Sequence, residues 1–512
     1  MVLRDEAHFG DRVVRCFAER PGSFYTVFSE AVSRNPDGEA LVCGEERLSW
    51  KTLEEQVVQV SVGLSSRGIG GGDRIALLLG NRGEFVVTLF AAARLGAIVV
   101  PLNIRSQKPE LAYVLEHCGA KLIVHETELA DRLPELPHRV AVKDFSVLLE
   151  TGSAEPAAVD EEDTAAILYT SGTTGRPKGA MLSHLGIVHS AMHYELGMGL
   201  TAADRSIAAV PLSHVTGLIA LIASMARCAG TLVLLPAFKA SEFLALAARE
   251  RMTHTVLVPA MYNLFLLEPD FERHELSRWR IGGYGGAPMP PPTIARFAEK
   301  LPGLGLMNLY GATETTSPAT MMPAHETAHR SDSVGLAVAC GEIRAMDDAG
   351  REVLPGEPGE LWIKGPMVVR GYWNDAAATA REFTGGFWHS GDIGAVHAQG
   401  FVYVFDRKKD MINRGGYKIY SAEVESALLE HPGVLEAAVV AGPCPVLGER
   451  VHAFVTLRRS LTVTSETLRA FCLERLADYK APESFTFRAE PLPRNANGKV
   501  LKRALREELS AH

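Results

Sequence analysis

The stretch Tyr169-Thr-Ser-Gly-Thr-Thr-Gly-Arg-Pro-Lys-Gly179 decides how the rest of the sequence is interpreted. It follows the apolar run AAIL, so it leaves a buried strand as a loop rich in hydroxyls and glycines. Glycines let backbone N–H groups approach an oxyanion closely, and Arg176 and Lys178 add positive charge. The loop therefore predicts a phosphate site. It does not fit the Walker A pattern GxxxxGK[ST], and a polar surface loop is the alternative that composition leaves open.

Strands and helices alternate on both sides of this loop. Apolar residues recur at helical spacing from Leu53 to Leu64, and the strand-like RIALLLG follows from Arg74. A helix from Glu84 to Leu95 and the strand AIVVPL come next, and TLVLLP, EFLALAARER and THTVLVPA repeat the pattern. Continuous apolar strands between helices predict an α/β fold of helix-covered mixed or parallel sheets.

The pattern changes near residue 360. GELWIKG and FVYVFDR indicate antiparallel strands, and the charged stretch DRKKDMINRGG follows at residues 406–416. Beyond it we expect a helix from Ser421, the strands LEAAVVAG and ERVHAFVTLR, a helix SETLRAFCLERL and a strand SFTFRAE. The sequence thus predicts a large N-terminal domain with a β-rich subdomain, residues 1–408, and a small α+β domain, residues 409–512.

Composition excludes several classes of protein. The 512 residues are 47% hydrophobic and 22% charged, which is typical of a globular enzyme. A net charge of −9 argues against a general nucleic-acid binder. Seven widely spaced cysteines without a CxxC predict a reducing compartment and disfavour zinc or disulfides. Because the N-terminus is charged and Arg94 and Arg227 interrupt the long apolar stretches, we expect a cytoplasmic protein without membrane spans.

Three further segments carry groups suited to a nucleotide. Gly283-Tyr-Gly-Gly-Ala-Pro288 offers flat backbone for a planar base, although a structural turn explains it equally well. In Asn308-Leu-Tyr-Gly-Ala-Thr-Glu314, Tyr310 can stack, Thr313 can donate to phosphate and Glu314 can hold Mg²⁺. The alternative for this segment is a strand end with a capping threonine and a solvated glutamate.

Two more segments offer an acceptor and a cation. Asp392 in HSGDIG suits the two hydroxyls of a ribose, and Arg407 at a strand end could support a ribose or a phosphate. The alternative for Asp392 is an Asx-type turn. Lys499 in PRNANGK could present a mobile ammonium, although most lysines are simply solvated. HExxH, GxSxG and a GxGxxG after a strand are absent from the sequence, which disfavours a metalloprotease, an α/β-hydrolase and a Rossmann oxidoreductase.

In their order along the chain, these motifs resemble the acyl-adenylate-forming superfamily of acyl-CoA synthetases, luciferase and nonribosomal adenylation domains. The resemblance runs from about Phe24 to Arg506 and is carried by YTSGTTGRPKG, GGAPMP, YGATET, HSGDIG, DRKKD, GGYKIYSAEVE and PRNANGK. Within the superfamily these motifs favour the bacterial fatty-acyl and 4-coumarate-like CoA ligases. GGYKI departs from the GGENI-like block of many relatives.

The resemblance implies ATP, Mg²⁺ and CoA as ligands and a mobile C-terminal lid. The implied catalytic residues are Lys499, Thr313, Glu314 and His214. Lys499 would contact the carboxylate and the α-phosphate, Thr313 the α-phosphate and Glu314 the metal, while His214 would lie between the acid pocket and the CoA channel. Lys409 would be the hinge. The implied ATP contacts are Thr170, Ser171, Gly172, Thr173, Thr174, Gly175, Lys178, Gly285, Ala287, Tyr310, Gly311, Asp392 and Arg407. The implied CoA channel contains Gly415 and Gly416. Candidates for the acid pocket are His214, Val215, Leu218, Tyr284, Gly311 and Thr316.

The implied function is an AMP-forming acid–CoA ligase acting on medium- or long-chain fatty acids. The motifs leave open an aryl or cinnamate-type acid, a carrier-protein thiol as acceptor, and a non-catalytic nucleotide sensor, while a luciferase-type oxygenase ranks lower. Because the chain lacks the Asp with which amino-acid-activating members hold an amine, we expect an acid without an α-amine. Expected partners are the small acid, ATP and CoA, not nucleic acid; a monomer or homodimer and peripheral membrane contact are both compatible.

Overall fold

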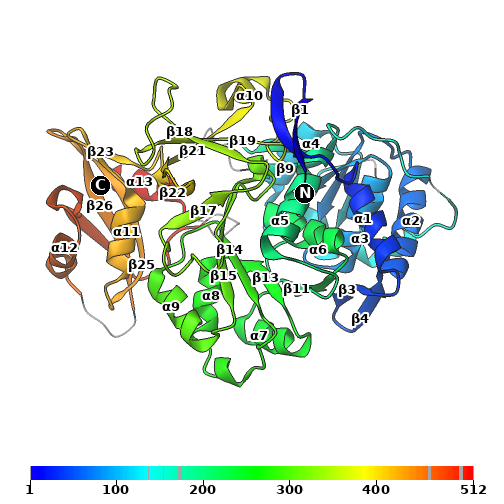
Figure 1. Ribbon diagram of the computed structural model, residues 1–512, viewed down its shortest axis with the longest axis horizontal. Coiled ribbons are helices and arrows are strands. Elements are labelled where there is room, and N and C mark those ends of the chain that lie inside the picture. The colour runs from blue at the N-terminus through cyan, green and yellow to red at the C-terminus, as the bar shows by residue number, and fades with distance from the viewer. Residues whose placement is uncertain are drawn as a thin grey trace. The chain divides into compact units, whose positions relative to one another are not determined.

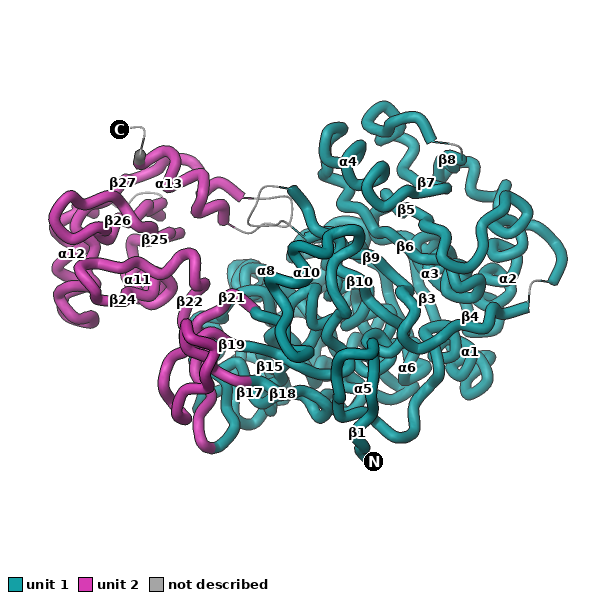
Figure 2. The backbone as a smooth tube through the Cα atoms, turned by 90° about the horizontal axis from the view of Figure 1, so that it is seen from above, with its two compact units in different colours: residues 1–343, 362–389, 399–402 teal, residues 344–361, 390–398, 403–512 magenta. Residues whose placement is uncertain are grey.

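The computed structural model describes residues 2–136, 138–153, 155–170, 176–458, 463–494 and 500–510. It contains two compact units, coloured separately in Figure 2. Residues 1–343, 362–389 and 399–402 form the first unit, and residues 344–361, 390–398 and 403–512 form the second. The boundary predicted between residues 408 and 409 stays a prediction.

The first sheet of the first unit carries the phosphate-loop candidate. Among the described residues it has six strands in the order β10-β9-β6-β5-β7-β8. Neighbouring strands are parallel, except that β9 and β10 form an antiparallel pair. The strands are β5 (Arg74–Leu78), β6 (Ile98–Pro101), β7 (Leu122–His125), β8 (His138–Ala141), β9 (Thr164–Thr170) and β10 (Lys178–Ser183).

A second sheet of the first unit runs in the order β17-β16-β15-β14-β13-β11-β12-β3-β4. Its central strands, from β3 to β15, are parallel neighbours. The strands are β3 (Glu39–Cys43), β4 (Glu46–Ser49), β11 (Arg205–Ala208), β12 (Thr231–Leu234), β13 (His254–Leu257), β14 (Ile281–Gly285), β15 (Gly305–Tyr310), β16 (Thr320–Met321) and β17 (Ser333–Ala337).

Helices cover these sheets, as Figure 1 shows. Helix α3 (Gly83–Arg94) contacts β6 of one sheet and β3 of the other, so it lies between them. Its side chains are buried almost all round, as expected for a helix enclosed on both sides. The other helices are α1 (Phe24–Arg34), α2 (Trp50–Ser66), α4 (Lys108–Cys118), α5 (His184–Met198), α6 (Ser224–Cys228), α7 (Ala240–Arg249), α8 (Pro259–Phe265), α9 (Pro291–Lys300) and α10 (Ala376–Glu382).

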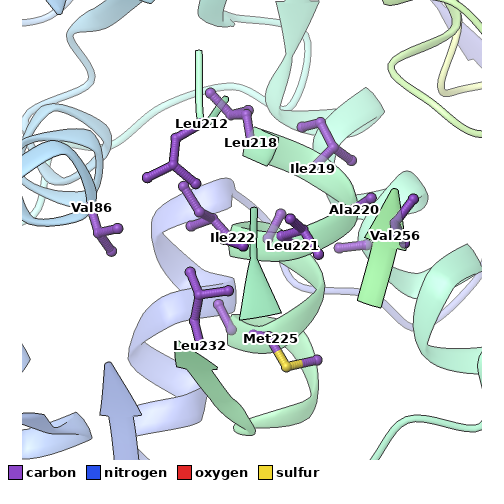
Figure 3. Close-up of a cluster of buried hydrophobic side chains, with 14 of the residues drawn as sticks. Val86, Leu212, Leu218, Ile219, Ala220, Leu221, Ile222, Met225, Leu232 and Val256 are labelled. Atoms are coloured by element: carbon purple, nitrogen blue, oxygen red, sulfur yellow. The ribbon is translucent and has the colours of Figure 1, made fainter. Parts of the chain in front are cut away.

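The π-helix η3 (Thr216–Ala223) lies within the core of the first unit. Leu218, Ile219 and Leu221 are completely buried there, and Figure 3 shows them beside Leu232 of β12 and Val256 of β13. The apolar stretch from Gly217 is therefore buried helix followed by strand. Within the described part of the chain, no helix combines the length and apolar character that a membrane crossing requires.

The second unit contains a smaller sheet in the order β24-β23-β26-β25, with β27 beside β26. Apolar residues of its strands and helices, such as Ile412, Val439 and Leu468, form a core of their own. The elements are β23 (Ile412–Arg414), β24 (Tyr417–Ile419), α11 (Ser421–Leu429), β25 (Val434–Cys444), β26 (Gly448–Leu457), α12 (Ser465–Leu473), β27 (Ser484–Arg488) and α13 (Lys502–Ser510).

Four strands contribute residues to both units: β18 (Glu342–Met346), β19 (Gly359–Lys364), β21 (Phe387–Val396) and β22 (Phe401–Arg407). An N-terminal hairpin, β1 (Leu3–His8) and β2 (Arg12–Phe17), precedes the sheets of the first unit. All seven cysteines are free thiols. The mixed α/β architecture with helix-covered sheets confirms the predicted fold class.

Candidate active site

The phosphate-loop candidate begins where β9 ends and finishes where β10 begins. Thr170 and Lys178 are paired across the two strands, so the base of the loop is fixed by the sheet. The guanidinium of Arg176 lies over the ring of Tyr113, at 5.7 Å from its centre. The predicted phosphate contacts Ser171, Gly172, Thr173, Thr174 and Gly175 lie outside the described residues, as does Lys499.

Lys178 is a buried cation with a defined partner. Its residue is only 9% exposed, and its Nζ lies 2.7 and 2.6 Å from the two carboxylate oxygens of Glu382 at the end of α10. The same ammonium lies 4.2 Å from the centre of the Tyr372 ring. Burial acts to raise the pKa of Glu382, but hydrogen bonds from Lys178, Tyr372 and Arg381 hold it below its usual value. Lys178 therefore forms a buried ion pair with Glu382.

Glu314 lies close to the base of the same loop. It belongs to the short 3₁₀ segment η5 (Thr313–Thr315), which follows β15, and it is 8% exposed. Thr170 Oγ1 donates to Glu314 Oε1 at 3.4 Å, and the Tyr372 hydroxyl lies 3.0 Å from that oxygen. The structure thus brings Glu314 to Thr170 and Lys178, although Glu314 lies 144 residues after Thr170 in the sequence. A carboxylate and a hydroxyl are oxygen donors of the kind that Mg²⁺ prefers, so these residues fit the implied metal.

The predicted adenine contacts lie at the ends of two adjacent parallel strands. Gly285 ends β14 and Tyr310 ends β15, and Gly285 pairs with Leu309 in the register of the two strands. A Cβ added at Gly285 would lie 2.4 Å from the Leu309 carbonyl oxygen, so the close strand approach requires glycine. Ala287 is exposed, whereas Gly311 and Thr313 are half-buried. Nucleotide sites in α/β proteins lie at such carboxyl ends of strands.

The predicted ribose contacts form an ion pair within the second unit. Arg407 Nε lies 2.7 Å from Asp392 Oδ1, and the Arg407 guanidinium also donates to the Ser390 carbonyl oxygen at 3.3 Å. Asp392 is 4% exposed, and its backbone N–H donates to the Ser390 hydroxyl. The two residues that the sequence proposed for one role are therefore in direct contact.

Gly415 and Gly416 form the tip of the β23–β24 hairpin. Arg414 pairs with Tyr417, so the two glycines are the whole loop, and their φ values are 57° and 93°. Positive φ at both central residues is what a tight hairpin of this kind requires, and glycine adopts it without strain. The tip therefore presents backbone without side chains. Lys409, the predicted hinge, lies exposed between β22 and β23.

The predicted acid pocket contains residues of very different exposure. His214 is half-buried, and burial of its ring lowers its pKa, so the imidazole is mainly neutral at pH 7. Val215 is 5% exposed, while Leu218 and Tyr284 are enclosed in the core. Thr316 is fully buried, and among the described residues its hydroxyl has no hydrogen-bond partner. The lining role of these residues, including Gly311, stays a prediction.

Two residues of this site were missed by the sequence analysis. Tyr372 and Glu382 connect Lys178 to Glu314, although 204 residues separate Lys178 from Glu382. A tyrosine in GYW and a glutamate at the end of a short helix carry no local sign of this role. Only the pairing of distant elements reveals it.

Comparison with known proteins agrees with the geometry. The family model of the AMP-binding enzymes matches residues 28–373, and the model of their C-terminal domain matches residues 423–499. A feruloyl-CoA synthase of Amycolatopsis sp is 34% identical over 92% of this chain and 96% of its own length. The long-chain-fatty-acid–CoA ligase FadD13 of Mycobacterium tuberculosis is 33% identical over 88% of this chain and 90% of its own length.

Among solved structures, the o-succinylbenzoate CoA synthetase of Bacillus subtilis is similar over nearly the whole chain. Its complex with the acyl-adenylate intermediate has a TM-score of 0.85 and 31% identity, covering 96% of this chain and 98% of that one. Its complex with ATP and magnesium has a TM-score of 0.84 and 30% identity, covering 94% and 99%.

Proposed function

The chain belongs to the family of AMP-binding enzymes, and from this membership we propose that it is an ATP-dependent carboxylic acid–CoA ligase that works through an acyl-AMP. The observation that carries the proposal is the meeting of Thr170, Lys178 and Glu314 at one edge of the first sheet. A cation, a carboxylate and a hydroxyl in that arrangement suit a metal-bound nucleotide phosphate. CoA ligases similar over most of their length support the same reaction.

The reaction has two steps. The carboxylate oxygen of the acid attacks the α-phosphorus of ATP, forming acyl-AMP and releasing pyrophosphate. The thiolate of CoA then attacks the acyl carbon, and AMP leaves. The first step brings an anion to a polyanion, so cationic groups must reduce the repulsion and hold the attack in line. Bound Mg²⁺ would supply charge neutralisation at the phosphates.

Residues of this chain have distinct roles in the proposal. Lys178 and the loop before it hold the β- and γ-phosphates, and Thr313 contacts the α-phosphate. Glu314 holds the metal, and Lys499 contacts the acid carboxylate. Asp392 and Arg407 bind the ribose. We further propose that residues 1–408 and 409–512 are the two working domains, that Lys409 is the hinge between two lid positions, and that the tip at Gly415 and Gly416 lines the CoA channel.

Medium- or long-chain fatty acids are the substrates that we propose. The candidate lining includes the apolar Val215 and Leu218, and one of the similar proteins is a long-chain-fatty-acid–CoA ligase. Aryl acids are the second candidate. The buried Thr316 hydroxyl, which has no partner within the described part of the chain, favours them, because a phenolic or methoxy substituent would satisfy it. A feruloyl-CoA synthase is also among the relatives.

The deciding experiment is ATP–pyrophosphate exchange with a panel of acids that covers alkyl chains of several lengths and cinnamates. We expect exchange that depends on the acid, and consumption of free CoA with AMP as the product. Release of ADP would refute the proposal. Loading of a carrier protein without use of free CoA would show that the acyl acceptor is a carrier-protein thiol and not CoA. Failure of every acid to drive exchange, with ATP still bound, would favour a nucleotide sensor. A cytoplasmic location and a monomer or homodimer remain predictions.

A further inference from the structure

Glu382 is placed to compete with phosphate for Lys178. Both of its oxygens accept from the Lys178 ammonium, at 2.7 and 2.6 Å, and Arg381 donates to it at 2.9 Å. A buried ammonium without a partner is costly, so the carboxylate compensates the lysine while no nucleotide is present. A phosphate that binds Lys178 therefore competes with this carboxylate for the ammonium.

The Tyr372 hydroxyl connects that carboxylate to Glu314. Its oxygen lies 2.7 Å from Glu382 Oε2 and 3.0 Å from Glu314 Oε1. Burial and the nearby carboxylates of Glu314 and Glu382 raise the pKa of Tyr372 far above its usual value, so the phenol keeps its proton. A phenol has one proton and donates one strong hydrogen bond at a time. The phenol therefore donates its hydrogen bond to whichever carboxylate, Glu314 or Glu382, has less positive charge beside it.

We propose that Glu382 is a positioning residue, and that the single Tyr372 proton couples phosphate binding at Lys178 to Mg²⁺ binding at Glu314. When phosphate withdraws Lys178 from Glu382, that carboxylate loses its main cation and attracts the Tyr372 proton. The proton turns away from Glu314, whose oxygen is then available to the metal. A metal at Glu314 has the converse effect, because it turns the proton toward Glu382 and loosens the hold on Lys178. No covalent bond changes, and the inference rests on the proposed function.

Coupling of this kind is reciprocal, so either ligand reports it. Removing the hydroxyl removes the coupling and leaves both binding groups in place. We expect Tyr372→Phe to reduce the gain in ATP affinity that Mg²⁺ provides by about tenfold, within the usual range of such couplings. Glu382→Gln removes the competitor for Lys178, so ATP should bind several-fold more tightly without metal and gain less from Mg²⁺. A merely structural role would weaken binding under both conditions.

The experiment is calorimetric titration of the full chain with ATP, once with excess Mg²⁺ and once with chelator. Because free ATP itself binds Mg²⁺, the ratio of the two affinities in each variant is compared with that in the wild-type protein. The controls are Tyr25→Phe, whose buried hydroxyl contacts Arg94, and Glu242→Gln, whose carboxylate pairs with Lys239 at 2.7 Å. Both should retain the wild-type ratio.

Two outcomes would overturn the inference and are distinct from failure of the proposed function. The first is an unchanged Mg²⁺ effect in Tyr372→Phe, and the second is metal-free ATP binding in Glu382→Gln that is no tighter than in the wild type. Wild-type protein that binds no ATP in either condition would refute the proposed function and the coupling together. Thermal unfolding of each variant shows whether it is folded. Tyr372→Phe removes the shared hydrogen-bond donor, whereas Glu382→Gln removes the competitor for Lys178, so the two variants test separate steps of the inference.

Discussion

The Nε atom of Arg407 lies 2.7 Å from Oδ1 of Asp392, a carboxylate that is almost completely buried. Burial strengthens the interaction of this charge with its neighbours, and the arginine fixes one of its two oxygens. In the proposed function the carboxylate accepts hydrogen bonds from the ribose hydroxyls.

Asp392→Asn should therefore raise the KM for ATP by about tenfold, the loss expected for hydrogen bonds to a charged group. It should also abolish the preference for ATP over 3′-deoxy-ATP in acid-dependent pyrophosphate exchange. Asp348→Asn is the matched control, because Asp348 pairs with Lys408 at 3.0 Å but is exposed. A variant that still discriminates fully between the two nucleotides would remove Asp392 from the ribose site.

Lys499→Ala should slow adenylation by about 10²–10³, the effect of losing one preorganised charge donor. Formation of the thioester from supplied acyl-AMP should continue, because that step does not need the ammonium. Single-turnover assays of each step measure this difference. Arg503→Ala removes an exposed cation on α13 and should leave both steps unchanged. Equal loss of the two steps in Lys499→Ala would contradict the assigned role.

Lys409→Pro should spare adenylation and block thioester formation. Proline fixes φ, so it restricts the backbone at the proposed hinge while it leaves the nucleotide contacts intact. Lys409→Ala removes the same side chain without this restriction and should keep both activities. Pyrophosphate exchange and overall thioester synthesis are measured in parallel. An unchanged overall rate in the proline variant would locate the hinge elsewhere.

Stability should fall below about pH 6.5, the ordinary pKa of histidine. Burial lowers the pKa of His184, His189 and His254 to about 4 and holds that of His193 well below its usual value. Below pH 6.5 the unfolded chain takes up protons that the folded chain does not, so acid favours unfolding. Each histidine should cost about 1.4 kcal/mol of unfolding free energy per pH unit down to its folded pKa.

Denaturant unfolding at several pH values between about 7 and 5 tests this dependence. His193→Leu should have a shallower pH slope than the wild type, whatever its stability at neutral pH. His325→Leu replaces an exposed histidine and should leave the slope unchanged. Parallel curves for the wild type and His193→Leu would show that this histidine does not contribute.

The sequence was most informative where a strand is enclosed on both faces. The strands β5 and β12 were predicted correctly because every residue in their centres must be apolar. The helix α13 was missed because its residues 502–510 are mostly charged, and among residues 502–509, whose burial is described, only Leu505 is fully buried. The π character of the helix η3 was not predicted, since a segment that is apolar on all sides has no periodicity from which its turn can be read.

The candidate site also contains some residues that the sequence indicates and others that it does not. Thr170, Glu314 and Asp392 lie in short motifs whose residue types indicate their chemistry, so a sequence alone can propose them. Glu382 was missed because its partner Lys178 is 204 residues away in the sequence, and only the fold brings the start of β10 and the end of α10 together. Contacts of that kind depend on topology, and no local pattern specifies them.

Because η3 is a π-helix, its turn is wider than that of an α-helix, and the number of residues in this segment is constrained. Gly217 packs so closely on residue 211 that an added Cβ would lie 2.3 Å from the Pro211 carbonyl oxygen, which anchors the start of the helix. Deleting one residue between 218 and 223 would turn everything downstream by the angle of one helical position relative to that anchor. The register of α6 against its neighbours would be lost, so insertions and deletions should be tolerated far less here than substitutions between apolar side chains.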